Sequence, residues 1–197
     1  MLIKSTLYLV TGPARSGKSE WAETLAAQFG QSVIYVATSQ LDPTDQEWQR
    51  RIEQHRDRRP EHWHLWEVPL ALPEAILAAT AQDCLLVDSL GTWLANTLDQ
   101  DDDTWQGTVE VLLDSLQRTP SQVILVAEET GWGLVPAYPV GRLFRDRLGS
   151  LTRQVGAIAG SVYLVVAGYA LDVRRLGEGV GEMGRWGDGE MGRWGRR

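Results

Sequence analysis

Residues 7–19 read LYLVTGPARSGKS, and this stretch decides the fold of the chain. Four strand-forming residues lead into G-x-x-x-x-G-K-S, the signature of a P-loop. Gly12 and Gly17 let the backbone wrap closely around an anion, so that successive N–H groups face phosphate oxygens. Lys18 supplies a positive charge for the β- and γ-phosphates, and the Ser19 hydroxyl supplies a hard oxygen for Mg²⁺. The stretch therefore predicts a nucleoside triphosphate site, made of Gly12, Pro13, Ala14, Arg15, Ser16, Gly17, Lys18 and Ser19.

The length and composition of the chain predict one α/β domain with a full core, since it has 197 residues of which 43% are hydrophobic. We expect no membrane span, because no apolar run reaches the ~18 residues that one needs. The net charge of -7 argues against an extended nucleic-acid surface. The first strand follows Met1 so closely that we expect no signal peptide, and the single cysteine, Cys84, lies in an apolar run. These features predict a cytoplasmic protein without disulfides and with Cys84 in its core.

Apolar strand-like and helix-like segments alternate along the chain, which predicts a P-loop NTPase of the α/β class. We expect a three-layer α/β/α, RecA-like arrangement around a mostly parallel sheet. The pattern leaves open the strand order and whether 65–68 joins the sheet. The predicted strands are 7–10, 32–37, 83–88, 122–127 and 161–167, and the predicted helices are 19–29, 46–57, 72–80, 90–98, 105–116 and 143–159.

The C-terminal segment has a different composition, because the stretch GEMGRWG at 181–187 recurs at 189–195. A glycine-rich repeat with few aliphatic residues cannot bury enough surface to offset the entropy of its chain. We therefore expect a folded domain over residues 1–176 and a disordered extension over residues 177–197.

Polar residues follow several of the predicted strands, at the end where ligands of open α/β sheets bind. Asp88 ends the strand at 83–88, where a P-loop fold places the carboxylate that holds Mg²⁺ directly or through water. Glu128 and Glu129 follow the strand at 122–127 and open a loop with two glycines and Trp132. This composition predicts a lid or a substrate contact.

His55 allows two interpretations. Trp48, Ile52 and His55 fall on one face of the helix predicted at 46–57, so that the imidazole either packs in the core or turns toward the nucleotide. The helical geometry by itself favours the packed histidine. His62 and His64 have no cysteine or third histidine at ligand spacing, and we interpret them as surface residues.

A basic cluster, Arg56-Asp57-Arg58-Arg59, follows His55 in an otherwise acidic chain. One interpretation is a solvated loop. The other is a phosphate clamp, because each guanidinium offers paired donors that match phosphate oxygens.

Together these motifs resemble one family, the bifunctional adenosylcobinamide kinase and adenosylcobinamide-phosphate guanylyltransferase of cobalamin biosynthesis. The P-loop is shared with many kinases, but its combination with R-I-x-x-H-x-D-x-R-P and E-x-G-x-G-x-V-P is specific. The resemblance spans about 7–170, and its matching stretches are TGPARSGKS at 11–19, YVATS at 35–39, RIEQHRDRRP at 51–60, LVD at 86–88 and ETGWGLVP at 129–136.

The resemblance implies two reactions at one P-loop. In the first, Lys18 and Mg²⁺ stabilise γ-phosphoryl transfer from ATP or GTP to the hydroxyl of adenosylcobinamide. In the second, His55 takes GMP from GTP as a covalent phosphoramidate and passes it to adenosylcobinamide phosphate. This implied role replaces the interpretation of His55 as a histidine packed in the core. The resemblance also implies a trimer, Asp88 near metal or ribose, and guanine-nucleotide contacts from Ala37, Thr38, Ser39, Arg56, Asp57, Arg58, Arg59 and Glu67.

The chain departs from the family pattern at three places. Arg58 stands where the family often has glycine, Glu128 stands where many members have asparagine, and the glycine-rich tail lies outside the pattern. Two other functions therefore stay open: a single-function kinase of another small alcohol, in which His55 only packs, and a nucleotide-dependent regulatory module. Spacing does not mark the choice between ATP and GTP in the kinase step.

Overall fold

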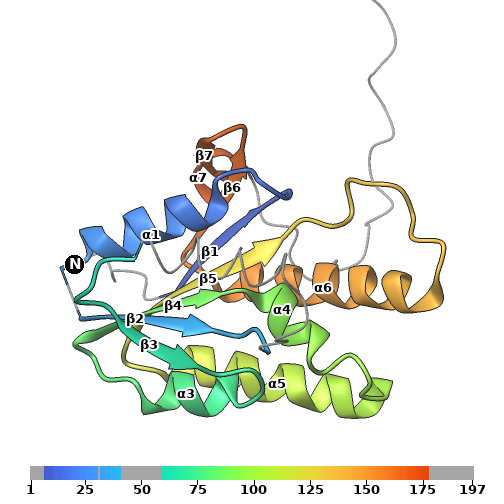
Figure 1. Ribbon diagram of the computed structural model, residues 1–197, viewed down its shortest axis with the longest axis horizontal. Coiled ribbons are helices and arrows are strands. Elements are labelled where there is room, and N and C mark those ends of the chain that lie inside the picture. Colours follow the sequence, from blue (N-terminus) through green and yellow to red (C-terminus); the bar gives the residue numbers. More distant parts are fainter. Residues whose placement is uncertain (1–6, 31, 41–58, 178–197) are drawn as a thin grey trace, which may run out of the picture.

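The protein is a seven-stranded sheet between two layers of helices (Figure 1). The computed structural model describes residues 7–30, 32–40 and 59–177. All pairs of neighbouring strands are parallel except β6 with β7, and the strand order is β3-β2-β4-β5-β1-β6-β7. The predicted α/β class and three-layer, mostly parallel architecture are confirmed. The strands are β1 (Leu7–Gly12), β2 (Ser32–Ala37), β3 (His64–Glu67), β4 (Asp83–Asp88), β5 (Gln122–Glu128), β6 (Ser161–Val166) and β7 (Tyr169–Asp172).

The two faces of the sheet are covered unequally (Figure 1). Side chains alternate along each strand, so Leu7 and Leu9 of β1 enter one core cluster while Tyr8 and Val10 enter the other. The first cluster includes residues of α3, α4, α5 and α6, and the second includes residues of α1. Burial on both faces explains why the strands are nearly continuous apolar runs. The helices are α1 (Lys18–Gln28), α3 (Leu72–Ala78), α4 (Leu90–Ala95), α5 (Asp102–Arg118), α6 (Pro139–Ile158) and α7 (Val173–Leu176).

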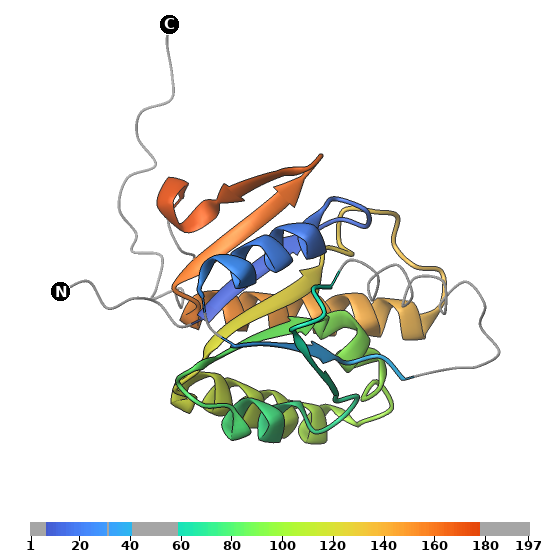
Figure 2. The ribbon, with the colours of Figure 1, turned by 60° about the vertical axis from the view of Figure 1, so that its left-hand side comes forward.

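The two edges of the sheet settle one open question and add one element. The segment at 65–68 does join the sheet, because β3 pairs with β2 in parallel. At the other edge, β7 turns back on β6 as an antiparallel hairpin that the sequence reasoning did not predict (Figure 2). Ala167 and Gly168 form the turn with φ values of 52° and 80°. A two-residue turn with positive φ at both positions matches the twist of a hairpin.

Two helices begin earlier than expected. Helix α5 starts at Asp102, not near Trp105, because the side chain of Asp101 accepts a hydrogen bond from Thr104 N at 2.8 Å and caps it. The hydrogen bond from Thr104 lowers the pKa of Asp101. Residues 101–103 of the acidic run 99–103 therefore form the cap and the first turn of α5. Helix α6 starts at Pro139, not at Leu143, because proline is well suited to the first turn of a helix.

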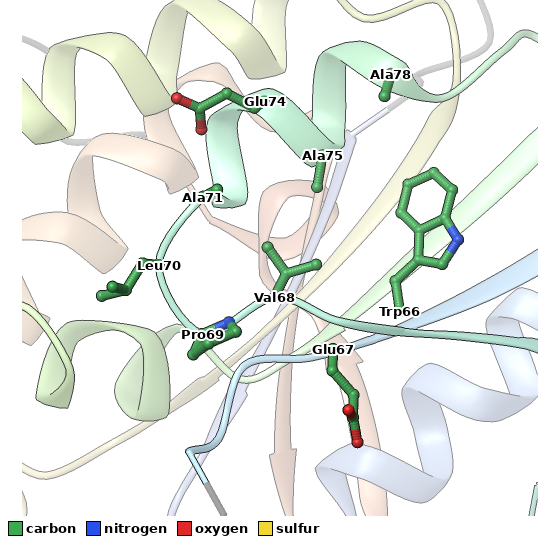
Figure 3. Close-up of a pocket in the computed structure, with 9 residues that line it drawn as sticks. All are labelled: Trp66, Glu67, Val68, Pro69, Leu70, Ala71, Glu74, Ala75 and Ala78. Atoms are coloured by element: carbon green, nitrogen blue, oxygen red, sulfur yellow. The ribbon is translucent and has the colours of Figure 1, made fainter.

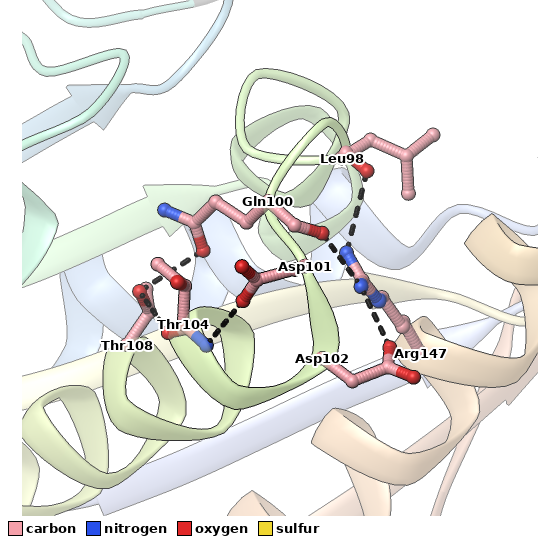
Figure 4. A network of polar contacts seen from close by, with 7 residues as sticks. All are labelled: Leu98, Gln100, Asp101, Asp102, Thr104, Thr108 and Arg147. Atoms are coloured by element: carbon pink, nitrogen blue, oxygen red, sulfur yellow. Dashed lines mark hydrogen bonds and ion pairs between the residues drawn. The ribbon is translucent and has the colours of Figure 1, made fainter.

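A buried arginine joins α6 to the connection between α4 and α5 (Figure 4). The guanidinium of Arg147 donates to Leu98 O at 3.3 Å, Gln100 O at 2.8 Å and Asp102 Oδ1 at 2.9 Å. Its carbon Cζ also lies 5.4 Å from the centroid of the Trp105 ring. Because the side chain is only 7% exposed, these contacts replace most of its hydration.

Cys84 is fully buried in β4, as predicted, and burial raises the pKa of its thiol to about 12. None of the helices in the described part of the chain has the length and apolar content that crossing a bilayer requires. The predicted helix at 46–57, His55 and the repeat at 181–195 lie outside the described residues.

Candidate nucleotide-binding site

The P-loop joins β1 to α1 and has the backbone that its glycines predict. Gly17 lies at φ 95°, a conformation that favours glycine, and α1 begins at the next residue. Gly12 has a second role that the motif does not reveal, because a Cβ at this position would lie 2.3 Å from Val165 O of β6. The hydroxyl of Ser16 is buried and has no hydrogen-bond partner among the described residues. An unpaired buried hydroxyl within a P-loop fits a phosphate oxygen.

Neighbouring elements hold the P-loop on both sides. Gly168 N in the β6–β7 turn donates to Ser16 O at 3.0 Å, and Glu129 N after β5 donates to Gly12 O at 2.9 Å. Lys18 Nζ lies across the loop, 3.5 Å from Pro13 O. The β6–β7 hairpin, which the sequence reasoning did not predict, thus holds the P-loop through a hydrogen bond. None of its residue types indicates this role.

The parallel strands bring the other predicted residues to the same edge of the sheet. Register pairs Ala37 with Asp88 on one side and with Glu67 on the other, while Gly12 pairs with Glu128. Strand β5 lies between β1 and β4, so Glu128, its last residue, lies at the end of a strand placed between the P-loop and Asp88. The carboxyl ends of five strands therefore form one continuous row.

The donor chemistry of this row fits Mg²⁺. Ser19 lies in the first turn of α1 and Asp88 at the end of β4, and both supply hard oxygen atoms. Among the described residues there is no cluster of three or more histidine, cysteine, aspartate or glutamate side chains that could hold a metal. Mg²⁺ needs no such cage, because it binds through one or two protein oxygens together with water and substrate phosphates.

Tyr35 lies between two of the predicted site residues, although sequence reasoning gave it no role. Its hydroxyl donates to Asp88 Oδ2 at 3.0 Å, and the Cζ atom of Arg59 lies 4.3 Å from the centroid of its ring. The only signal in the sequence was its place in the stretch YVATS, next to residues that the resemblance assigned to the nucleotide.

A buried polar network fixes the loop after β2. Thr38 Oγ1 donates to Ser89 O at 2.8 Å, and Asn96 Nδ2 donates to Thr38 O at 2.7 Å. Thr92 completes the network, since its hydroxyl lies in hydrogen-bond contact with that of Thr38 and its backbone N donates to Ser89 Oγ at 3.3 Å. The network explains why Thr38 is fully buried, and Ser39 follows directly at the row of strand ends.

Glu128 turns toward α4. Its Oε1 accepts a hydrogen bond from Ser89 Oγ at 2.5 Å, and its Oε2 accepts one from Gly91 N at 3.1 Å. Burial raises the pKa of Glu128 and the negative charge of Asp88 adds to the rise, whereas the Ser89 hydrogen bond and the charge of Lys18 oppose it. The side chain of Glu129 instead accepts a hydrogen bond from Thr11 Oγ1 at 3.4 Å.

The loop that follows these glutamates is exposed. Trp132 is 60% exposed, Leu134 97% and Val135 65%. Exposed apolar side chains beside a phosphate site suit a contact with a large substrate, and the role of this loop as a lid or substrate contact stays a prediction.

An apolar hollow lies at the β3 edge of the sheet, away from the P-loop (Figure 3). It measures about 570 Å³ and is lined by Trp66, Glu67, Val68, Pro69, Leu70, Ala71, Glu74, Ala75 and Ala78. In Figure 3 the carboxylate of Glu67 points away from α3. His62 and His64 are exposed, as their interpretation as surface residues requires. His55, Arg56, Asp57 and Arg58 lie outside the described residues.

A P-loop, a carboxylate at a nearby strand end and an α/β/α fold define a P-loop NTPase. The structure is similar to that of "a prototypical ATPase from the type III secretion system of pathogenic bacteria", with a TM-score of 0.51, 13% sequence identity, and coverage of 88% of this chain and 58% of that one. This likeness shows the fold. The chain belongs to the CobU family, described as cobinamide kinase / cobinamide phosphate guanyltransferase, whose model matches residues 8–173.

Two relatives of this chain support the family assignment. The chain is 44% identical over 168 residues to the bifunctional adenosylcobalamin biosynthesis protein CobP of Pseudomonas aeruginosa, covering 84% of this chain and 96% of the relative. It is 38% identical over 183 residues to the bifunctional adenosylcobalamin biosynthesis protein CobU of Escherichia coli, covering 85% of this chain and 99% of the relative. The resemblance stated from the motifs is confirmed.

Proposed function

We propose that this chain phosphorylates adenosylcobinamide with a nucleoside triphosphate and then transfers GMP from GTP to adenosylcobinamide phosphate. The observation that carries the proposal is family membership over residues 8–173, which takes in the P-loop, Asp88 and Arg59. The match to relatives of bifunctional name covers nearly their whole length, which supports both activities in one chain.

In the kinase reaction, the hydroxyl oxygen of adenosylcobinamide attacks the γ-phosphorus of ATP or GTP. The bond to the β–γ bridging oxygen breaks, the nucleoside diphosphate leaves, and the hydroxyl proton is released. We assign the phosphates to the backbone N–H groups of residues 14–19 and to Lys18, which stabilise the charge on the transferred group. Mg²⁺, held by Ser19 and Asp88, would neutralise phosphate charge.

In the guanylyl transfer, we assign the nucleophile to His55. A neutral imidazole nitrogen attacks the α-phosphorus of GTP and the bond to pyrophosphate breaks, which leaves a phosphoramidate. A phosphate oxygen of adenosylcobinamide phosphate then attacks the same phosphorus, and the P–N bond breaks to restore the imidazole. The guanidinium groups of Arg56, Arg58 and Arg59 would hold the phosphates, with Ala37, Thr38, Ser39, Asp57 and Glu67 around the nucleotide.

The test is the intact mass of the protein after incubation with Mg²⁺ and GTP, without any cobinamide. We expect a gain of one GMP that acid removes and that His55→Ala abolishes. The chain has three histidines, so His62→Ala and His64→Ala are matched controls that should keep the adduct. An adduct that survives in His55→Ala would contradict the assignment.

The same experiment separates the competing functions. A single-function kinase would bind nucleotide tightly and transfer only the γ-phosphoryl group, with no covalent GMP. A regulatory module would turn over slowly with every small acceptor. The trimer expected from the resemblance stays a prediction, as does the boundary between a domain at 1–176 and a tail at 177–197.

A further inference from the structure

The buried side chain of Tyr35 contacts both Asp88, the carboxylate of the kinase site, and Arg59 of the basic cluster that follows His55. Tyr35 is 4% exposed in the centre of β2. Its hydroxyl donates to Asp88 Oδ2 at 3.0 Å, and its ring lies under the guanidinium of Arg59 at 4.3 Å.

The parallel register explains the contact with Asp88. Tyr35 pairs with Leu86 of β4, and Asp88 follows Leu86 by two residues. Residues two apart on a strand project from the same face, so the carboxylate of Asp88 projects from the face that carries the Tyr35 ring. Tyr35 and Leu86 belong to the core cluster that also contains residues of α1, which is the helix that begins at the P-loop.

The tyrosine hydroxyl can act only as a donor to this carboxylate. A carboxylate only accepts hydrogen bonds, so the hydroxyl of Tyr35 is the donor in the 3.0 Å contact with Asp88 Oδ2. A donor on the rigid strand β2 holds the carboxylate of Asp88 in one orientation, and such outer contacts orient metal-binding carboxylates.

The ring face of Tyr35 makes a separate contact. A guanidinium within about 6 Å of a tyrosine centroid is attracted to the negative face of the ring, and burial strengthens the attraction. Arg59 is the last arginine of the R-I-x-x-H-x-D-x-R-P motif, four residues after His55 in the sequence. Stacking on a rigid ring presents the guanidinium in one plane, as paired contacts with a phosphate require.

We propose that Tyr35 is a positioning residue that sets Asp88 with its hydroxyl and Arg59 with its ring, and so serves both reactions. This inference rests on the proposed function for the identity of the two reactions. The two contacts use different parts of the side chain, so substitution can separate them.

The first measurement is the affinity for GTP at increasing Mg²⁺ concentrations, followed by calorimetry. Tyr35→Phe removes the hydroxyl and keeps the ring. We expect it to raise the Mg²⁺ concentration needed for half-maximal enhancement of binding by about 10-fold, the usual effect of losing an outer contact to a metal ligand. Affinity for GTP without Mg²⁺ should be unchanged, because the P-loop is intact.

The second measurement is the rate at which GMP becomes attached to the protein at saturating Mg²⁺. Tyr35→Phe should stay within about threefold of the wild type, because Arg59 keeps its ring. Tyr35→Leu removes the ring as well and should slow attachment by about 10-fold. The thermal unfolding of each variant is recorded, and the Phe variant carries the test if the Leu variant does not fold.

Tyr8→Phe is the matched control, because Tyr8 is also a buried tyrosine of the same core cluster and its ring lies against Phe29, 5.0 Å away. It should change neither measurement. The proposal is overturned if Tyr35→Phe has the Mg²⁺ dependence of the wild type, if Tyr8→Phe has an equal effect, or if the Leu and Phe variants attach GMP equally fast. If the proposed function is wrong, the wild type itself attaches no GMP. The measurement of Mg²⁺–GTP binding needs no cobinamide and no covalent step, so it tests the role of Tyr35 separately.

Discussion

Gly91 and Glu128 form a matched pair, and Gly91→Ala tests how strongly they depend on each other. A Cβ at position 91 would lie 2.1 Å from Glu128 Oε2 and 2.9 Å from its Cδ. The carboxylate would have to move and would lose its hydrogen bonds from Ser89 Oγ and Gly91 N. Each hydrogen bond to a charged group contributes about 1.5–3 kcal/mol, so the loss of both should lower the free energy of unfolding by about 3–6 kcal/mol.

The assay is urea unfolding of the two single variants and the double variant, which form a cycle. In a Glu128→Ala background the obstructing carboxylate is absent, so Gly91→Ala should be neutral or should stabilise α4 by about 0.5 kcal/mol through helix propensity. The control is Gly107→Ala in α5, where a Cβ would have no atom within 4 Å. It should stabilise the protein by about 0.5–1 kcal/mol.

The reasoning fails if Gly91→Ala loses less than about 1 kcal/mol, well short of the two hydrogen bonds at stake. It also fails if Gly91→Ala costs the same with and without the Glu128 carboxylate. In either case the carboxylate finds another position at little cost, and Gly91 has no special relation to it.

Two further perturbations follow from buried charged groups. Arg147→Met should lower the free energy of unfolding by about 2–4 kcal/mol, because two partly buried carbonyls lose their donor. Asp102→Asn should cost much less, since that carboxylate is 84% exposed, and equal losses in thermal unfolding would contradict this reasoning. The raised pKa of Glu128 means that the folded state holds this proton more tightly than the unfolded state does. The free energy of unfolding should therefore fall as pH rises from the ordinary pKa of a glutamate toward the raised pKa of Glu128. Glu128→Gln should remove this part of the pH dependence of urea unfolding between pH 4 and 8. A wild type that gains stability relative to the variant over this range would contradict the prediction.

The sequence predicted the local chemistry of the phosphate site well, because a P-loop is a contiguous motif. Its glycines, its lysine and the strand and helix on either side interact over neighbouring residues, so their spacing carries the information. The burial of Cys84 was also predicted from local information, because its neighbours in the sequence are apolar. Helix starts were less well predicted, because the cap of α5 is formed by Asp101, a residue type that is equally common in solvated loops.

The tertiary structure decided what depends on contacts between strands distant in the chain. Register places Asp88 beside Ala37 and brings the hydroxyl of Tyr35 to it, and no spacing within one strand encodes that pairing. The β6–β7 hairpin and its contact with Ser16 were invisible for the same reason.

Glu128 shows how the sequence and the tertiary structure give different information about one residue. Its sequence position predicted a substrate contact, whereas its carboxylate binds the start of α4 in a space that the absent side chain of Gly91 leaves open. The sequence by itself determined the family, the nucleotide motif and the alternation of strands with helices, because these follow from local patterns. Only the tertiary structure decided which side chains meet at the ends of the strands, because that depends on the strand order and register of the sheet.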